Sequence, residues 1–90
     1  MTQSIRLIAG LRGLMGTKQI EVTECGTVRE LLRVIERDYP VLAARILEDG
    51  QLNPEVLIVV NGQPMYALKG LDTPLLPTDD VMMIPPLLGG

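Results

Sequence analysis

The sequence has no histidine, no tryptophan, no phenylalanine and a single cysteine, Cys25. One thiol cannot form an intramolecular disulfide, and without histidine the usual nitrogen and sulfur ligands of a zinc site are not available. Serine–histidine–aspartate and cysteine–histidine arrangements are excluded for the same reason. We therefore expect no bound metal, no bound cofactor and no self-contained active site.

Positive charge is also scarce, with 8 Lys and Arg residues against 11 Asp and Glu residues and a net charge of −3. Nucleic-acid binding needs clustered basic residues, and single strands need aromatic stacking surfaces, but the aromatic residues here are two tyrosines. No apolar run approaches the roughly 20 residues of a membrane span. The first residues also lack the basic segment of a signal peptide. These features predict a cytoplasmic protein whose partners are neither nucleic acid nor membrane.

Apolar residues make up 47% of the 90 residues, which is enough for one modest globular core. Because aromatic residues are few, that core must consist of Leu, Ile, Val and Met side chains. The sequence shows no internal repeat and no linker. We therefore expect a single domain over residues 1–90.

Two strands and a helix are expected in the N-terminal half. Residues 4–11 and 17–24 alternate between apolar and polar, and residues 13–16 between them predict the turn of a hairpin. Thr27 and Glu30 have the spacing of a capping box, which starts a helix. The apolar residues with the spacing of one buried helical stripe are Val28, Leu31, Leu32, Ile35 and Tyr39.

The C-terminal half returns to strands after a short helix. Residues 41–48 predict that helix, closed by an Asp-Gly pair and followed by a loop over residues 51–54. Asn61-Gly62 is a strong signal for a two-residue hairpin turn. The segments that we predict as strands are residues 56–60, 65–68 and 81–84. The fold class is therefore α+β, with one main helix packed on one face of the sheet.

Three features resemble functional sites but have simpler explanations. Residues 10–18 resemble a phosphate-binding loop, yet the Thr-Lys order is reversed and a strand follows, so a hairpin turn is the better interpretation. No histidine or lysine adjoins Cys25 to lower its pKa, so we interpret it as an inert thiol. Asp79 and Asp80 form a carboxylate pair, but acidic residues before a strand are usually only solvated.

The last six residues combine properties that are unusual for a chain end. The two prolines remove two backbone donors and favour extended conformations, so the last strand cannot continue through them. The two leucines have no predicted core to enter, and the glycines have no Cβ to obstruct a narrow active site. An ionised α-carboxylate transfers its acyl group only after activation, such as adenylation by a separate ATP-using enzyme. The residues of this extended tail are Pro85, Pro86, Leu87, Leu88, Gly89 and Gly90.

Landmarks along nearly the whole chain resemble those of the ubiquitin-like sulfur carriers, which include the molybdopterin synthase small subunit and the thiamine-pathway carrier. They appear in the family's order and together are specific, although each is weak by itself. The matching segments are Gly26-Thr27-Val28, Leu31-Leu32, Tyr39-Pro40, Val60-Asn61-Gly62, Leu71-Asp72-Thr73-Pro74-Leu75, Asp80-Val81 and the Pro-Pro-x-x-Gly-Gly end.

The resemblance implies a β-grasp (ubiquitin-like) fold and a cycle of adenylation and sulfuration. Gly90 would become an acyl-adenylate on a ubiquitin-activating-type enzyme, which consumes the ATP, and then a thiocarboxylate. In the molybdopterin branch that thiocarboxylate enters the large synthase subunit and donates sulfur to a pterin precursor. The chain length and residues 41–48 favour this branch, molybdenum cofactor biosynthesis, over the shorter thiamine carrier. One departure is the Leu87-Leu88 pair, which is bulkier than the pair common in the family.

Other functions remain open at this stage. A carrier for thiamine, cysteine or another metabolite, or a ubiquitin-like modifier joined to lysines, would use the same C-terminal chemistry. A β-grasp interaction domain without catalytic role would not use it. For the molybdopterin branch, Ile8, Met82 and Ile84 are expected on the sheet face away from the helix, together with those central-strand residues that point the same way. We expect this apolar patch to dock the activating enzyme and the large synthase subunit in turn.

Overall fold

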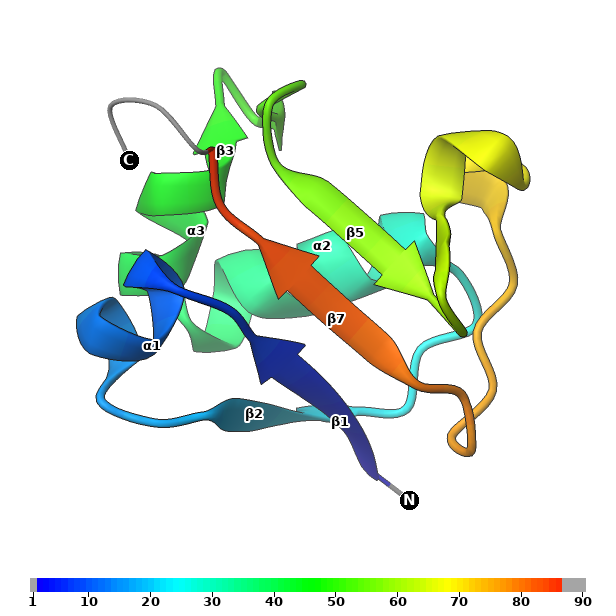
Figure 1. Cartoon of the computed structure of the whole chain (residues 1–90), viewed down its shortest axis with the longest axis horizontal. Coiled ribbons are helices and arrows are strands. Elements are labelled where there is room, and N and C mark those ends of the chain that lie inside the picture. Colours follow the sequence, from blue (N-terminus) through cyan, green and yellow to red (C-terminus); the bar gives the residue numbers. More distant parts are fainter. Residues whose placement is uncertain (1, 87–90) are drawn as a thin grey trace.

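A five-stranded mixed sheet forms the front layer of the molecule, and the main helix, α2 (Val28–Asp38), crosses behind it (Figure 1). The structure, a computed structural model, describes residues 2–86. The strands are, in their order across the sheet, β2 (Gln19–Thr23), β1 (Thr2–Leu7), β7 (Val81–Ile84), β5 (Leu57–Val60) and β6 (Gln63–Pro64). β1 and β7 pair in parallel, whereas all other neighbours are antiparallel. This arrangement confirms the expected α+β class and β-grasp topology.

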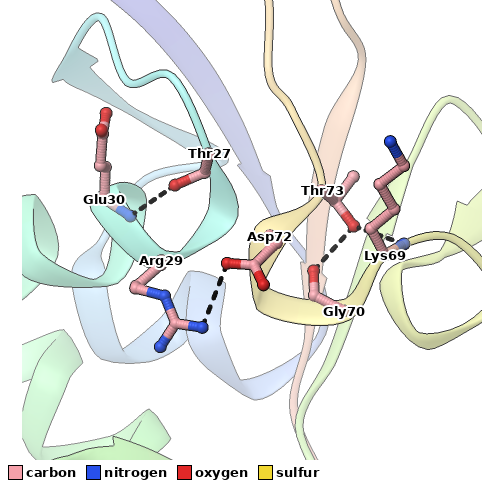
Figure 2. Close-up of polar contacts among 7 residues, drawn as sticks. All are labelled: Thr27, Arg29, Glu30, Lys69, Gly70, Asp72 and Thr73. Carbon is pink, nitrogen blue, oxygen red and sulfur yellow. Dashed lines mark hydrogen bonds and ion pairs between the residues drawn. The ribbon is translucent and has the colours of Figure 1, made fainter.

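Helix α2 begins where the capping box predicted it. The Thr27 hydroxyl accepts a hydrogen bond from the Glu30 N–H at 3.2 Å, a contact shown in Figure 2. The Glu30 carboxylate accepts from the Gly26 N–H at 2.6 Å, one residue before the N-cap that a standard capping box would use. One free N–H group of the first helical turn and the N–H group just before the N-cap are thereby satisfied.

The core lies between α2 and the inner face of the sheet. The apolar stripe of α2 is buried, apart from Tyr39, whose ring is half-buried and whose hydroxyl donates to the Glu21 carbonyl at 2.6 Å. The expected packing of the main helix on one face of the sheet is confirmed, and α3 (Pro40–Ile46) adds three further buried residues. The buried strand residues that share this core are Ile5, Leu7, Ile20, Val22, Ile58, Val60, Val81 and Met83.

The predicted turn at residues 13–16 is wrong. The structure has instead a six-residue helix, α1 (Gly10–Met15), which is closed by Gly16 in the left-handed conformation with φ of 70°. Leu11 and Met15 are one helical turn apart, and both pack against the core. Strand β1 also ends at Leu7, earlier than expected, because Ala9 has a φ of 52° that no strand continues through.

Two further boundaries differ from the prediction. The expected loop at 51–54 begins with β4 (Gln51–Leu52), which pairs with β3 (Leu47–Glu48) across Asp49-Gly50, both at positive φ. The expected strand at 65–68 is the 3₁₀ helix η1 (Met65–Ala67), because pairing with β5 stops at Pro64. A second 3₁₀ helix, η2 (Gly70–Asp72), follows. The Asn61-Gly62 hairpin turn is confirmed, with φ values of 51° and 83°.

The packing of α2 predicts which of its residues carry stability. Ile35→Ala should lower the free energy of unfolding by about 2–5 kcal/mol, since Ile35 is fully buried and its truncation leaves a cavity. The neighbouring, exposed Glu36→Ala should change it by less than about 0.5 kcal/mol. Urea unfolding of both variants checks this prediction, and equal small losses would contradict the assigned helix face.

Candidate functional site

The outer face of the sheet, away from α2, carries an apolar patch. Met82 and Ile84 alternate along β7 with buried core residues, and both are half-exposed. The antiparallel ladder places Val59 opposite Met82 and Leu57 opposite Ile84, so all four side chains share one face. Ile8 continues the alternation of β1, is half-buried, and its N–H donates to the Met83 carbonyl at 3.1 Å. We call this set, Ile8, Leu57, Val59, Met82 and Ile84, the outer patch.

Sequence reasoning found three of these five residues. Residues 56–60 are apolar without alternation, so the sequence does not reveal which of them face outward. Their facing depends on the register with β7, in which Ile58 pairs with Met83. The tight Asn61-Gly62 turn fixes only the register of β5 with β6, whereas the Asn61 N–H donates to the Asp80 carbonyl at 2.7 Å, next to the β5–β7 ladder.

Polar side chains border the outer patch on the β1–β2 side. The Arg6 guanidinium donates to both carboxylate oxygens of Asp80, at 3.0 and 2.7 Å, and the Ser4 hydroxyl donates to the Glu21 carboxylate at 2.6 Å. These side chains are exposed, so the ion pair adds little stability. The outer face is thus divided into an apolar half over β7 and β5 and a polar half over β1 and β2.

The start of the predicted tail is part of the globule. Pro85 is buried directly after β7, and Pro86 is half-buried. Any extended arm therefore begins beyond Pro85. The other tail residues, Leu87, Leu88, Gly89 and Gly90, lie outside the described residues.

The Asp79 carboxylate stabilises the turn before β7, whereas the Asp80 carboxylate forms the ion pair with Arg6. Asp79 accepts from the Asn61 side-chain amide at 3.1 Å and from the Leu76 N–H at 2.8 Å. The Asn61 side-chain oxygen in turn accepts from the Asp80 N–H at 2.9 Å. Each group has a structural partner, and the two carboxylates do not form an acid–base pair.

The glycine-rich segment and the cysteine also have structural roles. Residues 10–15 form α1, and β2 follows, so no long helix presents an N-terminus to an anion there. Cys25 is 1% exposed, and its thiol donates to the Thr23 carbonyl at 3.0 Å. Burial, with a smaller contribution from the Glu30 carboxylate, raises the pKa of this thiol above its ordinary value.

Residues 2–86 contain no cluster of three or more His, Cys, Asp or Glu side chains placed to hold a metal ion. Within the same residues, no helix has the length and apolar character that crossing a membrane requires.

Comparison with known proteins identifies the class. The model of the ThiS family matches residues 5–90. Small archaeal modifier protein 3 of Haloferax volcanii is 37% identical over 92 residues, with 100% of both chains covered. A protein of Archaeoglobus fulgidus, provisionally named a sulfur carrier, is 30% identical over 91 residues, again covering 100% of both. The crystal structure of small archaeal modifier protein 1 from Haloferax volcanii superposes with a TM-score of 0.82 at 25% identity, covering 100% of each chain.

These matches define a ubiquitin-like β-grasp protein of the sulfur carrier and small modifier type. The chain belongs to the ThiS family.

The environment of Cys25 gives a prediction about its reactivity. Because the thiol is buried and its pKa is raised, iodoacetamide should alkylate it at least about tenfold more slowly than a free cysteine at pH 8. In urea the two rates should become equal. Intact-mass measurement over time follows the reaction, and rapid alkylation of the folded chain would contradict the assignment of an inert thiol.

Proposed function

We propose that this protein is a sulfur carrier whose reacting group is the C-terminal carboxylate of Gly90. A ubiquitin-activating-type partner enzyme binds the chain and ATP. One carboxylate oxygen attacks the α-phosphorus of ATP, pyrophosphate leaves, and an acyl-adenylate forms. A sulfide-level sulfur nucleophile then attacks the acyl carbon, AMP leaves, and the product is a thiocarboxylate. The observation that carries the proposal is the match of residues 5–90 to the ThiS family.

The described structure supports the proposal by the way in which it holds the chain end. β7 pairs on both sides, with β1 and with β5, and Pro85 is buried after it. The residues that follow are therefore attached at a fixed point, and Gly89 and Gly90 add no side chain to a narrow active site. The chain binds no ATP itself in this mechanism, since the partner supplies that site.

The outer patch is the surface that fits the partner enzymes. It lies around Ile84, next to the point where the tail leaves the sheet, so a protein docked on it is positioned to receive the tail. Its apolar centre with a polar border has the composition of a protein interface. The activating enzyme and the sulfur-accepting enzyme bind this surface in turn.

For the acceptor, we propose the large subunit of molybdopterin synthase, with this chain as the small subunit. The support is α3, the short helix that follows α2. The sequence predicted this helix at residues 41–48, a segment that favours the molybdopterin branch over the shorter thiamine carrier. In that pathway the thiocarboxylate sulfur is transferred to a pterin precursor in molybdenum cofactor biosynthesis.

A second candidate function is protein modification. It is favoured by the 37% identity, over the whole of both chains, to small archaeal modifier protein 3. The same acyl-adenylate is used, but a lysine amine attacks the acyl carbon, AMP and a proton leave, and an isopeptide bond forms. The two functions differ in their products, because a carrier gains sulfur and is released, whereas a modifier remains attached to its target.

Removal of Gly90 tests the proposed reacting group. The truncated chain places its carboxylate about 3.5 Å short of the adenylation site, and a displacement of even about 1 Å can cost 100-fold in rate. Thiocarboxylate formation should therefore be lost while the unfolding midpoint is unchanged. The measurement is intact mass after incubation with ATP, sulfide and the activating enzyme.

The matched control is Gly13→Ala, since Gly13 lies in α1 and a Cβ there meets no atom within 4 Å. This variant should be sulfurated like the parent chain. Sulfuration of the truncated chain would overturn the proposal. High-mass conjugates in place of the sulfurated monomer would favour the modifier function.

Met82→Glu tests the outer patch. A carboxylate at this half-exposed position must be desolvated in an apolar interface, so affinity for the activating enzyme should fall by about 10-fold or more. Val41→Glu is the control, because Val41 is an equally apolar, 58% exposed residue on α3 and should not affect binding. Titration calorimetry measures both, and equal affinities for the two variants would place the interface elsewhere.

A further inference from the structure

A groove of about 630 Å³ adjoins the outer patch, with which it shares Leu57 as a lining residue. It runs between α2, the β3–β4 hairpin, the beginning of β5 and the two 3₁₀ helices. Its volume falls within the range of binding pockets for small ligands and short peptide segments. The apolar side chains that line its floor are Leu32, Leu52, Ile58, Met65 and Leu71.

The rim of this groove carries groups that commonly anchor a protein partner. Arg33 lines it from the exposed side of α2 and has no polar partner within the described part of the chain. Arg29, one helical turn earlier, is held by an ion pair with Asp72 of η2 at 3.2 Å (Figure 2). Tyr66, one of only two tyrosines, is 72% exposed at the same rim. Exposed tyrosine and arginine beside an apolar pocket are typical of interface hot spots.

These features define the chemistry of the occupant. The floor fits one or two aliphatic side chains, and the unpaired guanidinium of Arg33 fits a carboxylate, which it can bind with two hydrogen bonds. The chain itself contains such a segment, since residues 87–90 are two leucines and two glycines before an α-carboxylate. We propose that the groove binds the C-terminal segment of a second copy of this chain, with its leucines on the apolar floor and its carboxylate at Arg33.

The sheet topology favours a second copy over the same molecule. β5 lies between β7, from which the tail leaves, and β6, after which η1 and Tyr66 follow. A tail of four residues spans at most about 14 Å and would have to cross the beginning of β5 to reach the far rim. A second copy has no such constraint. Exchange of tails between two copies gives a closed, symmetric dimer in which both grooves are filled.

This arrangement would withhold the carboxylate from the activating enzyme when the chain is abundant and unpartnered. The inference requires only that Gly90 carries a free carboxylate and does not require sulfur transfer. It can therefore fail while the proposed function stands, and the reverse is also true.

The test uses the full chain and, as a probe, the acetylated hexapeptide with the sequence of residues 85–90. In a nitrogen-15 NMR titration, the peptide should shift the amide signals of Leu32, Leu52 and Tyr66. The signals of Ile8 and Met82, which belong to the outer patch and do not line the groove, should stay unchanged. Arg33→Gln should weaken peptide binding by up to about fivefold, as expected for an exposed charge pair. The peptide with a C-terminal amide should be weakened similarly. Arg37→Gln, an exposed arginine on α2 that does not line the groove, is the control and should bind like the parent.

Sedimentation over a range of chain concentrations tests the dimer. The parent chain should associate as its concentration rises, and a chain with both Leu87→Asp and Leu88→Asp should remain monomeric. Peptide shifts confined to the outer patch, or no shifts at millimolar peptide, would overturn the groove assignment. A third result would exclude the second copy. In that result the parent stays monomeric at all concentrations, but its groove amide signals differ from those of the double variant. The occupant would then be the chain's own tail.

Discussion

The parallel pairing of β1 with β7 is the contact on which the rest of the structure depends. It joins the first strand of the chain to the last and places β7 in the middle of the five-stranded sheet. Without it the β1–β2 hairpin has no continuous sheet with β5 and β6. Val81 and Met83 of the same strand complete the core beneath α2. The segment that leads to the chain end is therefore also the most central segment of the fold.

This constraint explains how one short chain holds the segment before its last residues in a fixed position. Strand β7 is held by hydrogen bonds to two neighbouring strands, and Pro85 directly after it is held by packing. The proposed chemistry takes place only a few residues further on, so the sheet positions the reacting group without contributing any side chain to the reaction. Such a division suits a protein that carries an activated group between partners, because each partner supplies its own catalytic residues.

Local sequence signals predicted the elements that local interactions stabilise. The Thr27 and Glu30 pair located the start of α2, and Asn61-Gly62 located the turn between β5 and β6, because both signals act through the backbone next to them. Helix α1 was missed because two glycines within six residues oppose a helix, and only the burial of Leu11 and Met15 against the distant core outweighs them. The contribution of Leu57 and Val59 to the outer patch was missed for a related reason, since it is set by pairing with β7 some 25 residues later.

The position of the incorporated sulfur tests the central claim most directly. The chain has two places where sulfur chemistry is possible, the C-terminal carboxylate of Gly90 and the buried thiol of Cys25. After incubation with ATP, labelled sulfide and the activating enzyme, tandem mass spectrometry of the intact chain locates the label. The account predicts the exchange of one oxygen for one sulfur in the terminal residue and no label on Cys25. A terminal residue that keeps both oxygens, although the enzyme converts ATP to AMP, would contradict it.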